Sequence, residues 1–225
     1  MTAYFITGTG TGVGKTYLTT ALCWQLSEQQ KSVVGLKPII SGFDAADPEN
    51  DTALILKSLG QEVNENTLAA ISPWQFAAPL APNMAAEMEQ REINPENVAA
   101  FCREVEEQVD LLLVEGAGGV MAPITHDYTM LDLMAALKYR VILVAGSYLG
   151  ALSHTLTAVM ALQSRGLDIA AVIISESEGS TVSLQATHDR LRSFIDPSIG
   201  VGVLSRVNRT EESWKHTPNL LAIFG

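Results

Sequence analysis

Residues 8–16 read Gly8-Thr9-Gly10-Thr11-Gly12-Val13-Gly14-Lys15-Thr16, between the apolar run 4–7 and a stretch of helical periodicity. A glycine-rich turn that leads from a strand into a helix directs several backbone N–H groups to one point. The helix N-terminus adds partial positive charge at the same place. A lysine and a threonine after the last glycine can then reach phosphate oxygens and Mg²⁺. The stretch is therefore predicted to be a phosphate-binding loop.

The spacing of this loop is one residue longer than the common motif G-x4-G-K-[ST]. The common motif would place glycine at position 9, where Thr9 stands, so the loop here is Gly8-x5-Gly14. Neither this stretch nor the second glycine-rich stretch, residues 116–119, begins the pattern G-x-G-x-x-G of dinucleotide-binding folds. We expect a nucleoside triphosphate, with Mg²⁺, rather than a dinucleotide.

Short runs of Val, Ile and Leu alternate along the chain with longer segments of helical period. Strands are predicted at residues 4–7, 33–37, 111–115, 141–145, 170–175 and 199–204. Helices are predicted at residues 15–30, 51–59, 95–108, 131–137, 151–165 and 182–194. The strands show little polar alternation, which is typical of parallel strands covered by helices.

This alternation predicts an α/β, single-domain P-loop NTPase fold over residues 1–225, with a mostly parallel sheet flanked by helices on both faces. Asn94-Pro95-Glu96 is a favourable helix start, because an N-cap residue precedes a proline at the first helical position. Residues 71–92, which include Pro79 and Pro82, do not follow the βα pattern and are expected to form an elaborated loop.

The composition excludes several classes of protein. The 225 residues include 14 basic and 25 acidic side chains, a formal net charge of −11, which argues against nucleic-acid and anionic-membrane partners. No apolar run approaches the roughly 18 residues of a membrane span, and no secretory signal is visible. Cys23 and Cys102 are the two cysteines and suggest a reducing compartment without a cysteine metal site. We expect a cytoplasmic protein.

Three further residues are candidates for phosphate chemistry. Glu115 ends the apolar run 111–115, where a P-loop protein needs a second Mg²⁺ anchor, although an ordinary surface acid is the alternative. Lys37 ends the second predicted strand, and parallel strands bring their carboxyl ends to one edge of the sheet. Two lysines over one phosphate suit γ-phosphoryl transfer, although a solvated strand-end lysine remains possible. Asp51 opens a helix and is expected either to cap it or to hold Mg²⁺.

With these residues in place, the sequence resembles the dethiobiotin synthetases. The resemblance covers most of the chain and rests on five blocks with matching spacing: Gly8-x5-Gly14-Lys15-Thr16, Lys37-Pro38-x-x-Ser41-Gly42, Pro79-x-x-Pro82, Val114-Glu115-Gly116-Ala117-Gly118-Gly119, and Leu149-Gly150 before His154. It implies a homodimeric ligase (cyclo-ligase) of biotin biosynthesis that acts on 7,8-diaminopelargonate, CO2 and ATP with Mg²⁺. In that family a substrate amine is carbamated, the carbamate takes the γ-phosphoryl group, and the second amine closes the ureido ring of dethiobiotin as phosphate leaves.

The resemblance also implies roles for individual residues. Lys37, Lys15, Thr11 and Ser41 would be the catalytic groups, and Thr16, Asp51 and Glu115 would surround Mg²⁺. The nucleotide would be bound by Gly12, Val13, Gly14, Lys15, Thr16, Tyr17, Glu115, Gly118 and Ser175. The substrate carboxylate would lie at a helix N-terminus of the partner subunit, formed by Gly150, Ala151, Leu152 and Ser153.

Several positions depart from the family pattern. Position 12 is Gly12 where glutamate is common, and Ser153 replaces an asparagine of some members. Ser175 stands where the family commonly has an asparagine that reads the adenine edge, and residues 203–206 lack the usual proline-aromatic pattern. We expect a relaxed base preference, with CTP or GTP partly replacing ATP.

The alternative of another class is a regulatory P-loop ATPase of the partitioning or cell-division type. Such proteins carry a lysine early in the loop, at the position of Gly10 here, and often a basic membrane helix or DNA-binding surface. A synthetase domain of a cobyrinic-acid-type amidotransferase would require a glutaminase domain, for which 225 residues leave no room. A nucleotide-binding relative without turnover stays open, although Lys15, Lys37 and Glu115 argue against it.

Overall fold

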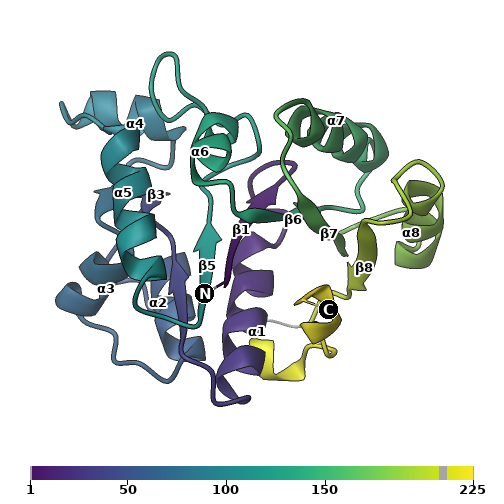
Figure 1. The fold of residues 1–225 in the computed structure, drawn as a ribbon, viewed down its shortest axis with the longest axis horizontal. Helices are drawn as coiled ribbons and strands as arrows, with labels where there is room; N and C mark the ends of the chain where they lie inside the picture. Colours follow the sequence, from purple (N-terminus) through teal and green to yellow (C-terminus); the bar gives the residue numbers. More distant parts are fainter. Residues whose placement is uncertain (1, 208–211, 225) are drawn as a thin grey trace.

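Six parallel strands form the central sheet of the computed structural model, which describes residues 2–207 and 212–224. Their order across the sheet is β2-β5-β1-β6-β7-β8 (Figure 1). The strands are β1 (Thr2–Gly8), β2 (Val33–Leu36), β5 (Leu111–Glu115), β6 (Arg140–Ala145), β7 (Ile169–Ser175) and β8 (Gly200–Leu204). Two further short strands, β3 (Ile39–Ser41) and β4 (Trp74–Phe76), pair in parallel with each other. The predicted parallel α/β sheet is confirmed.

The central strands are buried on both faces, which explains their continuous apolar sequences. All five residues of β5 are buried, and so are Val141 to Ala145 in β6. Helices cover these faces and remove the strands from water, so each residue along the strand must be apolar or paired. Glu115, at the end of β5, is the charged exception and is paired as described below.

Eight α-helices and two 3-10 helices lie in the described part of the chain. They are α1 (Lys15–Ser27), α2 (Asp51–Ser58), α3 (Glu65–Ile71), α4 (Pro82–Met88), α5 (Pro95–Glu106), α6 (Met130–Leu137), α7 (Ala151–Ser164), α8 (Leu184–Arg192), η1 (Ser213–His216) and η2 (Leu221–Phe224). Figure 1 shows α7 beside α8 and α5 beside α6, and both pairs are in contact. In the described residues no helix is both long enough and apolar enough to cross a membrane.

The connections place helices on opposite faces of the sheet. The chain passes from β1 through α1 toward the β2 edge, whereas α6, α7 and α8 connect strands toward the β8 edge. Because parallel crossovers are right-handed, opposite directions of travel put the two groups of helices on opposite faces. The carboxyl ends of all six strands therefore open at one edge, where the loops that follow them can share a ligand.

The predicted strands and helices of the βα units agree with the structure, with small differences at their ends. Helix α1 ends at Ser27 rather than at residue 30, because Gln30 adopts a left-handed backbone with φ of 59°. Strand β2 ends at Leu36, so Lys37 directly follows the strand. The helix start at Asn94 is confirmed, since its side chain accepts hydrogen bonds from the N–H groups of Glu96 and Asn97.

The prediction of an elaborated loop over residues 71–92 is wrong in part. This region contains strand β4 and helix α4, and helix α3 ends at its first residue. Pro82 occupies the first helical turn of α4, where proline has no hydrogen bond to lose. Strand β4 is held by its pairing with β3 rather than by its own three residues.

Candidate active site

The phosphate loop joins β1 to α1 and is tied to its neighbours by backbone hydrogen bonds. The Thr9 N–H donates to the carbonyl of Val144 in β6 at 2.9 Å, and the carbonyl of Gly8 accepts from the Val120 N–H at 2.9 Å. Gly12 and Gly14 have left-handed backbones with φ of 73° and 98°. Those angles turn the loop so that α1 begins at Lys15, and they explain why glycine stands at both positions.

Lys15 folds over this loop. Its Nζ donates to the carbonyl of Gly10 at 3.0 Å, and the side chain is buried. Burial lowers the Lys15 pKa, the charge of Lys37 adds to that effect, and Glu115 and Asp51 oppose it. A buried lysine that faces the loop interior is placed to neutralise an anion held by the loop amides.

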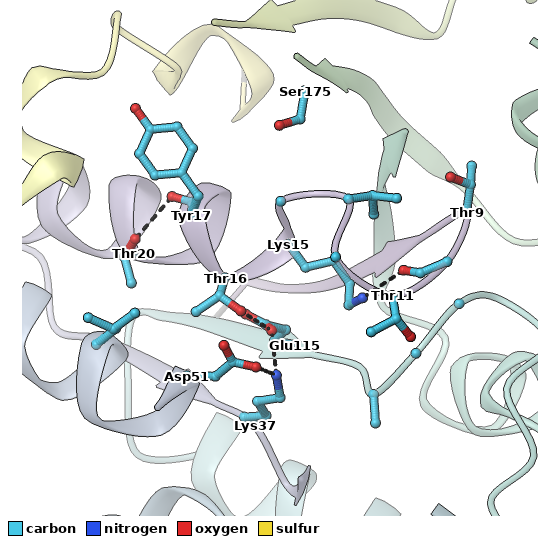
Figure 2. A pocket seen from close by; sticks show the side chains of 18 of the residues that line it. Thr9, Thr11, Lys15, Thr16, Tyr17, Thr20, Lys37, Asp51, Glu115 and Ser175 are labelled. Atoms are coloured by element: carbon cyan, nitrogen blue, oxygen red, sulfur yellow. Dashed lines mark hydrogen bonds and ion pairs between the residues drawn. The ribbon is translucent and has the colours of Figure 1, made fainter. Parts of the chain in front are cut away.

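Opposite the loop, Glu115 accepts three hydrogen bonds, and Figure 2 shows those from Thr16 and Lys37. Its Oε1 accepts from the Thr16 hydroxyl at 2.8 Å and from Lys37 Nζ at 2.9 Å, and its Oε2 accepts from the Thr19 hydroxyl at 2.7 Å. The carboxylate has no exposed surface, so these bonds replace the water that it loses. The alternative of an ordinary surface acid is excluded.

Lys37 forms ion pairs with both Glu115 and Asp51. Burial of the ammonium group opposes its charge, but the two carboxylates outweigh this effect and raise the Lys37 pKa above 10.5. Burial likewise opposes the charge of Asp51, and Lys37, together with a hydrogen bond from Thr16, brings the Asp51 pKa below 3.8. Lys37 is therefore a buried, charged lysine rather than a solvated strand-end lysine.

Asp51 does not cap helix α2. The cap is Asn50, whose side-chain oxygen accepts from the Ala53 N–H at 2.9 Å. The Asp51 carboxylate is free to face Lys37 and Thr16 instead, and its side chain keeps 39% of its surface exposed. Of the two sequence-based interpretations, capping is thus excluded.

The small residues after Glu115 pack against the phosphate loop. A Cβ added to Gly119 would lie 3.1 Å from the carbonyl oxygen of Gly8 and 3.2 Å from the Cα of Gly10. Two backbones can approach this closely only where a side chain is missing. Gly118 has a left-handed backbone with φ of 66°, and both Gly118 and Gly119 line the cavity described below.

One cavity of about 2170 Å³ joins these groups. It is lined by all the predicted catalytic, nucleotide-binding and metal-binding residues: Thr11, Gly12, Val13, Gly14, Lys15, Thr16, Tyr17, Lys37, Ser41, Asp51, Glu115, Gly118 and Ser175. The residues come from the loops that follow β1, β2 and β5, from the last residues of β5 and β7, from β3, and from the first turns of α1 and α2. The structure therefore brings these predicted residues together around one cavity.

The remaining four predicted residues lie elsewhere. Gly150, the N-cap residue of α7, and the following Ala151, Leu152 and Ser153 are absent from the described lining of this cavity. The next residue, His154, does line the cavity, and its Nδ1 shares a hydrogen bond of 2.8 Å with the Tyr148 hydroxyl. Residues 150–153 therefore lie outside the lining of this cavity, although His154 of the same helical turn lines it.

Ser175 lies against the start of α1, where Figure 2 shows it across the first helical turn from Lys37. A Cβ on Gly14 would come within 2.5 Å of the Ser175 hydroxyl oxygen. Beyond Ser175 the cavity wall is charged: the Arg206 guanidinium pairs with Glu178 at 2.9 Å, and the Arg206 N–H donates to Glu176 at 3.0 Å. Sequence analysis identified the 203–206 segment but missed the two glutamates.

Thr19 is the main functional candidate that the sequence analysis missed. It is fully buried one turn after Thr16, and it contacts the same carboxylate. Residues three apart lie on one face of a helix, so the spacing from Thr16 was the available signal. Nothing in the sequence showed that this face of α1 meets Glu115.

The strand order, the phosphate loop and the flanking helices define a P-loop nucleotide-binding protein. A family model described as AAA domain matches residues 2–216. Among solved structures, a chain of the MinC:MinD cell division protein complex from Aquifex aeolicus is similar, with a TM-score of 0.59, 14% identity, and coverage of 96% of this chain and 86% of that one. A ParA family ATPase from Chlorobium tepidum gives a TM-score of 0.53 with 14% identity, over 95% and 87% of the two chains. At these identities the likeness shows the fold alone.

Sequence relatives are more specific. A protein of Caulobacter vibrioides named ATP-dependent dethiobiotin synthetase BioD is 44% identical over 197 residues, which are 86% of this chain and 88% of the relative. The protein of the same name from Bacillus subtilis subsp. natto is 32% identical over 219 residues, 96% of this chain and 91% of the relative. The chain belongs to the dethiobiotin synthetase family, and the resemblance stated from its motifs is confirmed.

Proposed function

We propose that this chain is an ATP-dependent dethiobiotin synthetase, a ligase of biotin biosynthesis. Its substrates are 7,8-diaminopelargonate, CO2 and ATP, and it closes the ureido ring through a carbamic–phosphoric anhydride. The observation that carries this proposal is the convergence of two buried lysines, Lys15 and Lys37, on one cavity beside a phosphate loop. Phosphoryl transfer depends mainly on positioning and on stabilising charge, which two fixed cations supply.

Lys15 and the loop amides bind the triphosphate in this proposal. The hydrogen bond from Lys15 to the Gly10 carbonyl is exchanged for bonds to phosphate oxygens, which are stronger because they are charge-assisted. Gly12 and Gly14 let the loop amides face inward, and Val13 and Tyr17 flank them along the cavity.

Lys37 stabilises the charge of the transferring phosphoryl group. Lys37 directly follows the carboxyl end of β2, and its ammonium group is fixed between two carboxylates. This arrangement supports the role because the ammonium group is oriented before substrate binds. Thr11 and Ser41 line the same cavity with their hydroxyl groups and are proposed to hydrogen-bond the amine or carbamate end. The backbone of Gly118 approaches the same region.

Mg²⁺ is proposed to lie among Thr16, Asp51 and Glu115. In the described residues no group of three or more His, Cys, Asp or Glu side chains is arranged to hold a metal. That finding fits Mg²⁺ in a nucleotide site, because this ion is held by one or two carboxylates together with substrate phosphates and water. The Thr16 hydroxyl lies 2.8 Å from Oε1 of Glu115, and Lys37 pairs with both Glu115 and Asp51, so the three oxygen-bearing side chains converge on one part of the cavity. When bound, the ion would neutralise charge between the β- and γ-phosphates.

A homodimer with a shared substrate site is the proposed assembly. Gly150, the N-cap residue of α7, has no side chain to cap the helix, and the Ala151 N–H donates to the carbonyl of Tyr148 at 3.0 Å. In the described residues the N–H groups of Leu152 and Ser153 have no such partner and are open to an anion. The flanking Leu149 is 92% exposed, and Leu152 is also exposed, which supports coverage by a second copy. In such a dimer residues 150–153 bind the substrate carboxylate in the partner's site. Sedimentation that gives a monomer at micromolar concentration, with and without substrates, would contradict this assembly.

The base of the nucleotide is proposed to be read loosely. Ser175 offers a single hydroxyl oxygen, whereas an amide side chain presents a donor nitrogen and an acceptor oxygen side by side to the edge of adenine. The hydroxyl lies close to Gly14 and faces a wall of Glu176, Glu178 and Arg206. Turnover with ATP, CTP, GTP and UTP at equal concentrations tests the proposal. Strict dependence on ATP would show that other groups impose the selectivity.

We further propose that residues 1–225 act as one domain in the cytoplasm, without nucleic-acid or membrane partners. One hydrophobic core runs through the sheet and its helices, which supports a single domain. Both cysteines are free and buried, as expected where thiols stay reduced.

Phosphate release tests the proposed reaction. The purified protein is incubated with MgATP and bicarbonate, with and without 7,8-diaminopelargonate. Release that requires the diamine supports the synthetase, and release that ignores it would support the regulatory ATPase, which the comparisons do not favour. If neither reaction releases phosphate and the protein still binds nucleotide, the chain is a relative without turnover.

A further inference from the structure

The hydroxyl of Thr19 lies between two acceptors inside the protein. It is 2.7 Å from Oε2 of Glu115 and 2.9 Å from the carbonyl oxygen of Lys15, four residues earlier in α1. Neither Thr19 nor Glu115 has any exposed surface. A hydroxyl has one proton, and the carboxylate is the stronger acceptor because it is charged. The bond to Glu115 is therefore the main use of this proton.

Other buried threonines show what the usual arrangement looks like. Thr155 in α7 and Thr187 in α8 also lie in hydrogen-bond range of the carbonyl four residues earlier, at 2.6 and 3.3 Å. Within the described residues, the hydroxyl of each of these two threonines donates to that backbone carbonyl and to no side chain. Thr19 shares their local geometry, which fixes its rotamer, and adds a contact with a buried carboxylate.

The two oxygens of Glu115 have different surroundings. Oε1 faces Thr16 and Lys37, both of which border the cavity, whereas Oε2 faces Thr19 in the interior. When the Thr16 hydroxyl turns toward a ligand, Oε1 loses one donor and the carboxylate could rotate. The bond from Thr19 to Oε2 is independent of that change and holds the carboxylate plane in place.

We propose that Thr19 is a positioning residue that fixes the orientation of Glu115, so that one oxygen of this carboxylate always faces the phosphate loop. The inference rests on the proposed function through the assignment of Glu115 to the Mg²⁺ site. Residues that hydrogen-bond a metal-coordinating side chain and so fix its orientation typically contribute about 10- to 100-fold to metal affinity or activity.

Four variants isolate the hydroxyl. Thr19→Ser keeps it and Thr19→Ala removes it, and neither has the γ-methyl group. Thr19→Val keeps the branched shape without the hydroxyl. Thr187→Val is the matched control, because it removes a buried helical hydroxyl that does not contact the proposed site. Thermal unfolding of each variant identifies those that are folded. If the valine side chain crowds the core and Thr19→Val does not fold, the comparison of Thr19→Ser with Thr19→Ala still tests the hydroxyl.

The readout is the effect of Mg²⁺ on nucleotide binding rather than activity. ATP affinity is measured by calorimetry in excess chelator and across a Mg²⁺ titration. For Thr19→Ala and Thr19→Val we expect the Mg²⁺ concentration that gives half of the change in ATP affinity to rise by about 10- to 100-fold. The ATP affinity measured without metal should stay within about threefold of that of the unmodified protein. Thr19→Ser and Thr187→Val should behave as the unmodified protein.

Two outcomes would overturn the inference. If the unmodified protein responds to Mg²⁺ and Thr19→Ala responds at the same concentration, Thr19 is merely structural while the proposed metal site stands. If ATP affinity of the unmodified protein ignores Mg²⁺, the proposed metal site is wrong and the inference fails with it.

Discussion

Replacing Lys37 by methionine removes a buried charge while keeping a side chain of similar length. In the structure this charge is 2.9 Å from Oε1 of Glu115 and also pairs with Asp51. The side chain of Glu115 is 0% exposed, whereas that of Asp51 is 39% exposed. The variant therefore leaves one fully buried carboxylate without its cation, and one partly solvated carboxylate that water can serve.

The expected loss of stability follows from these two environments. Removing one partner of a buried ion pair costs about 3–5 kcal/mol, and a pair that is open to solvent adds about 1 kcal/mol or less. Because the hydroxyls of Thr16 and Thr19 still donate to Glu115, we expect the lower end, about 3 kcal/mol. For a protein of 225 residues this corresponds to a decrease in Tm of about 6–12 °C.

Urea unfolding at pH 7 measures this loss, and saturating steady-state kinetics measures kcat. We expect kcat to fall by about 10²-fold or more with little change in ATP affinity, since Lys37 acts on charge that develops in the transition state. The double variant Lys37→Met/Glu115→Gln should recover most of the lost stability and none of the lost kcat. The raised Lys37 pKa keeps the ion pair intact below pH 10.5, and its contribution disappears as the pH rises through the raised value.

Three results would refute the reasoning. A single variant within about 0.5 kcal/mol of the original stability would show that Glu115 does not depend on this cation. A kcat close to the original value would show that Lys37 takes no part in the transition state. A double variant that regains kcat as well as stability would mean that the single variant lost activity through misfolding alone.

Three other variants test separate parts of the site and fold. Lys15→Ala should weaken ATP binding and lower kcat together, each by about tenfold or more, because this lysine is proposed to bind the phosphates in the ground state and to bind them more strongly as charge develops in the transition state. Calorimetry measures the affinity, and initial rates at saturating ATP measure kcat. Asp51→Asn should be less stable than the original at pH 7. Because the Asp51 pKa is lowered, its contribution is present above pH 3.8 and is lost as the pH falls through the lowered value, so the two unfolding temperatures should converge in acid. Asn94→Ala removes a side chain that accepts two N–H groups of α5 and should cost about 1 kcal/mol in urea unfolding, without any change in kcat.

The sequence predicts the sheet well because its strands are buried on both faces. A strand such as β5 cannot tolerate polar residues along its length, so its apolar run appears in the sequence with the correct bounds. Strands β3 and β4 were missed because each has only three residues and is stabilised by the other across more than 30 positions of sequence. Pro82 indicated a loop, although proline is equally suited to the first turn of a helix.

The candidate site was predictable to the same extent and for a related reason. Residues at the carboxyl ends of parallel strands must converge, so Lys37 and Glu115 could be placed together without coordinates. The contact of Thr19 with Glu115 depends on how α1 is rotated against the sheet, which its sequence does not specify, since polar and apolar residues are mixed around this largely buried helix. For Asp51 the sequence left helix capping and Mg²⁺ binding open, because it did not show that Asn50 caps α2.

The most direct test of the account follows the carbon of bicarbonate. The protein is incubated with MgATP, 7,8-diaminopelargonate and bicarbonate labelled with ¹³C, and products are analysed by mass spectrometry. The account predicts dethiobiotin that carries one ¹³C in its ureido carbonyl, formed in step with ADP and phosphate and absent without the nucleotide. ADP formed without any labelled ring would contradict it.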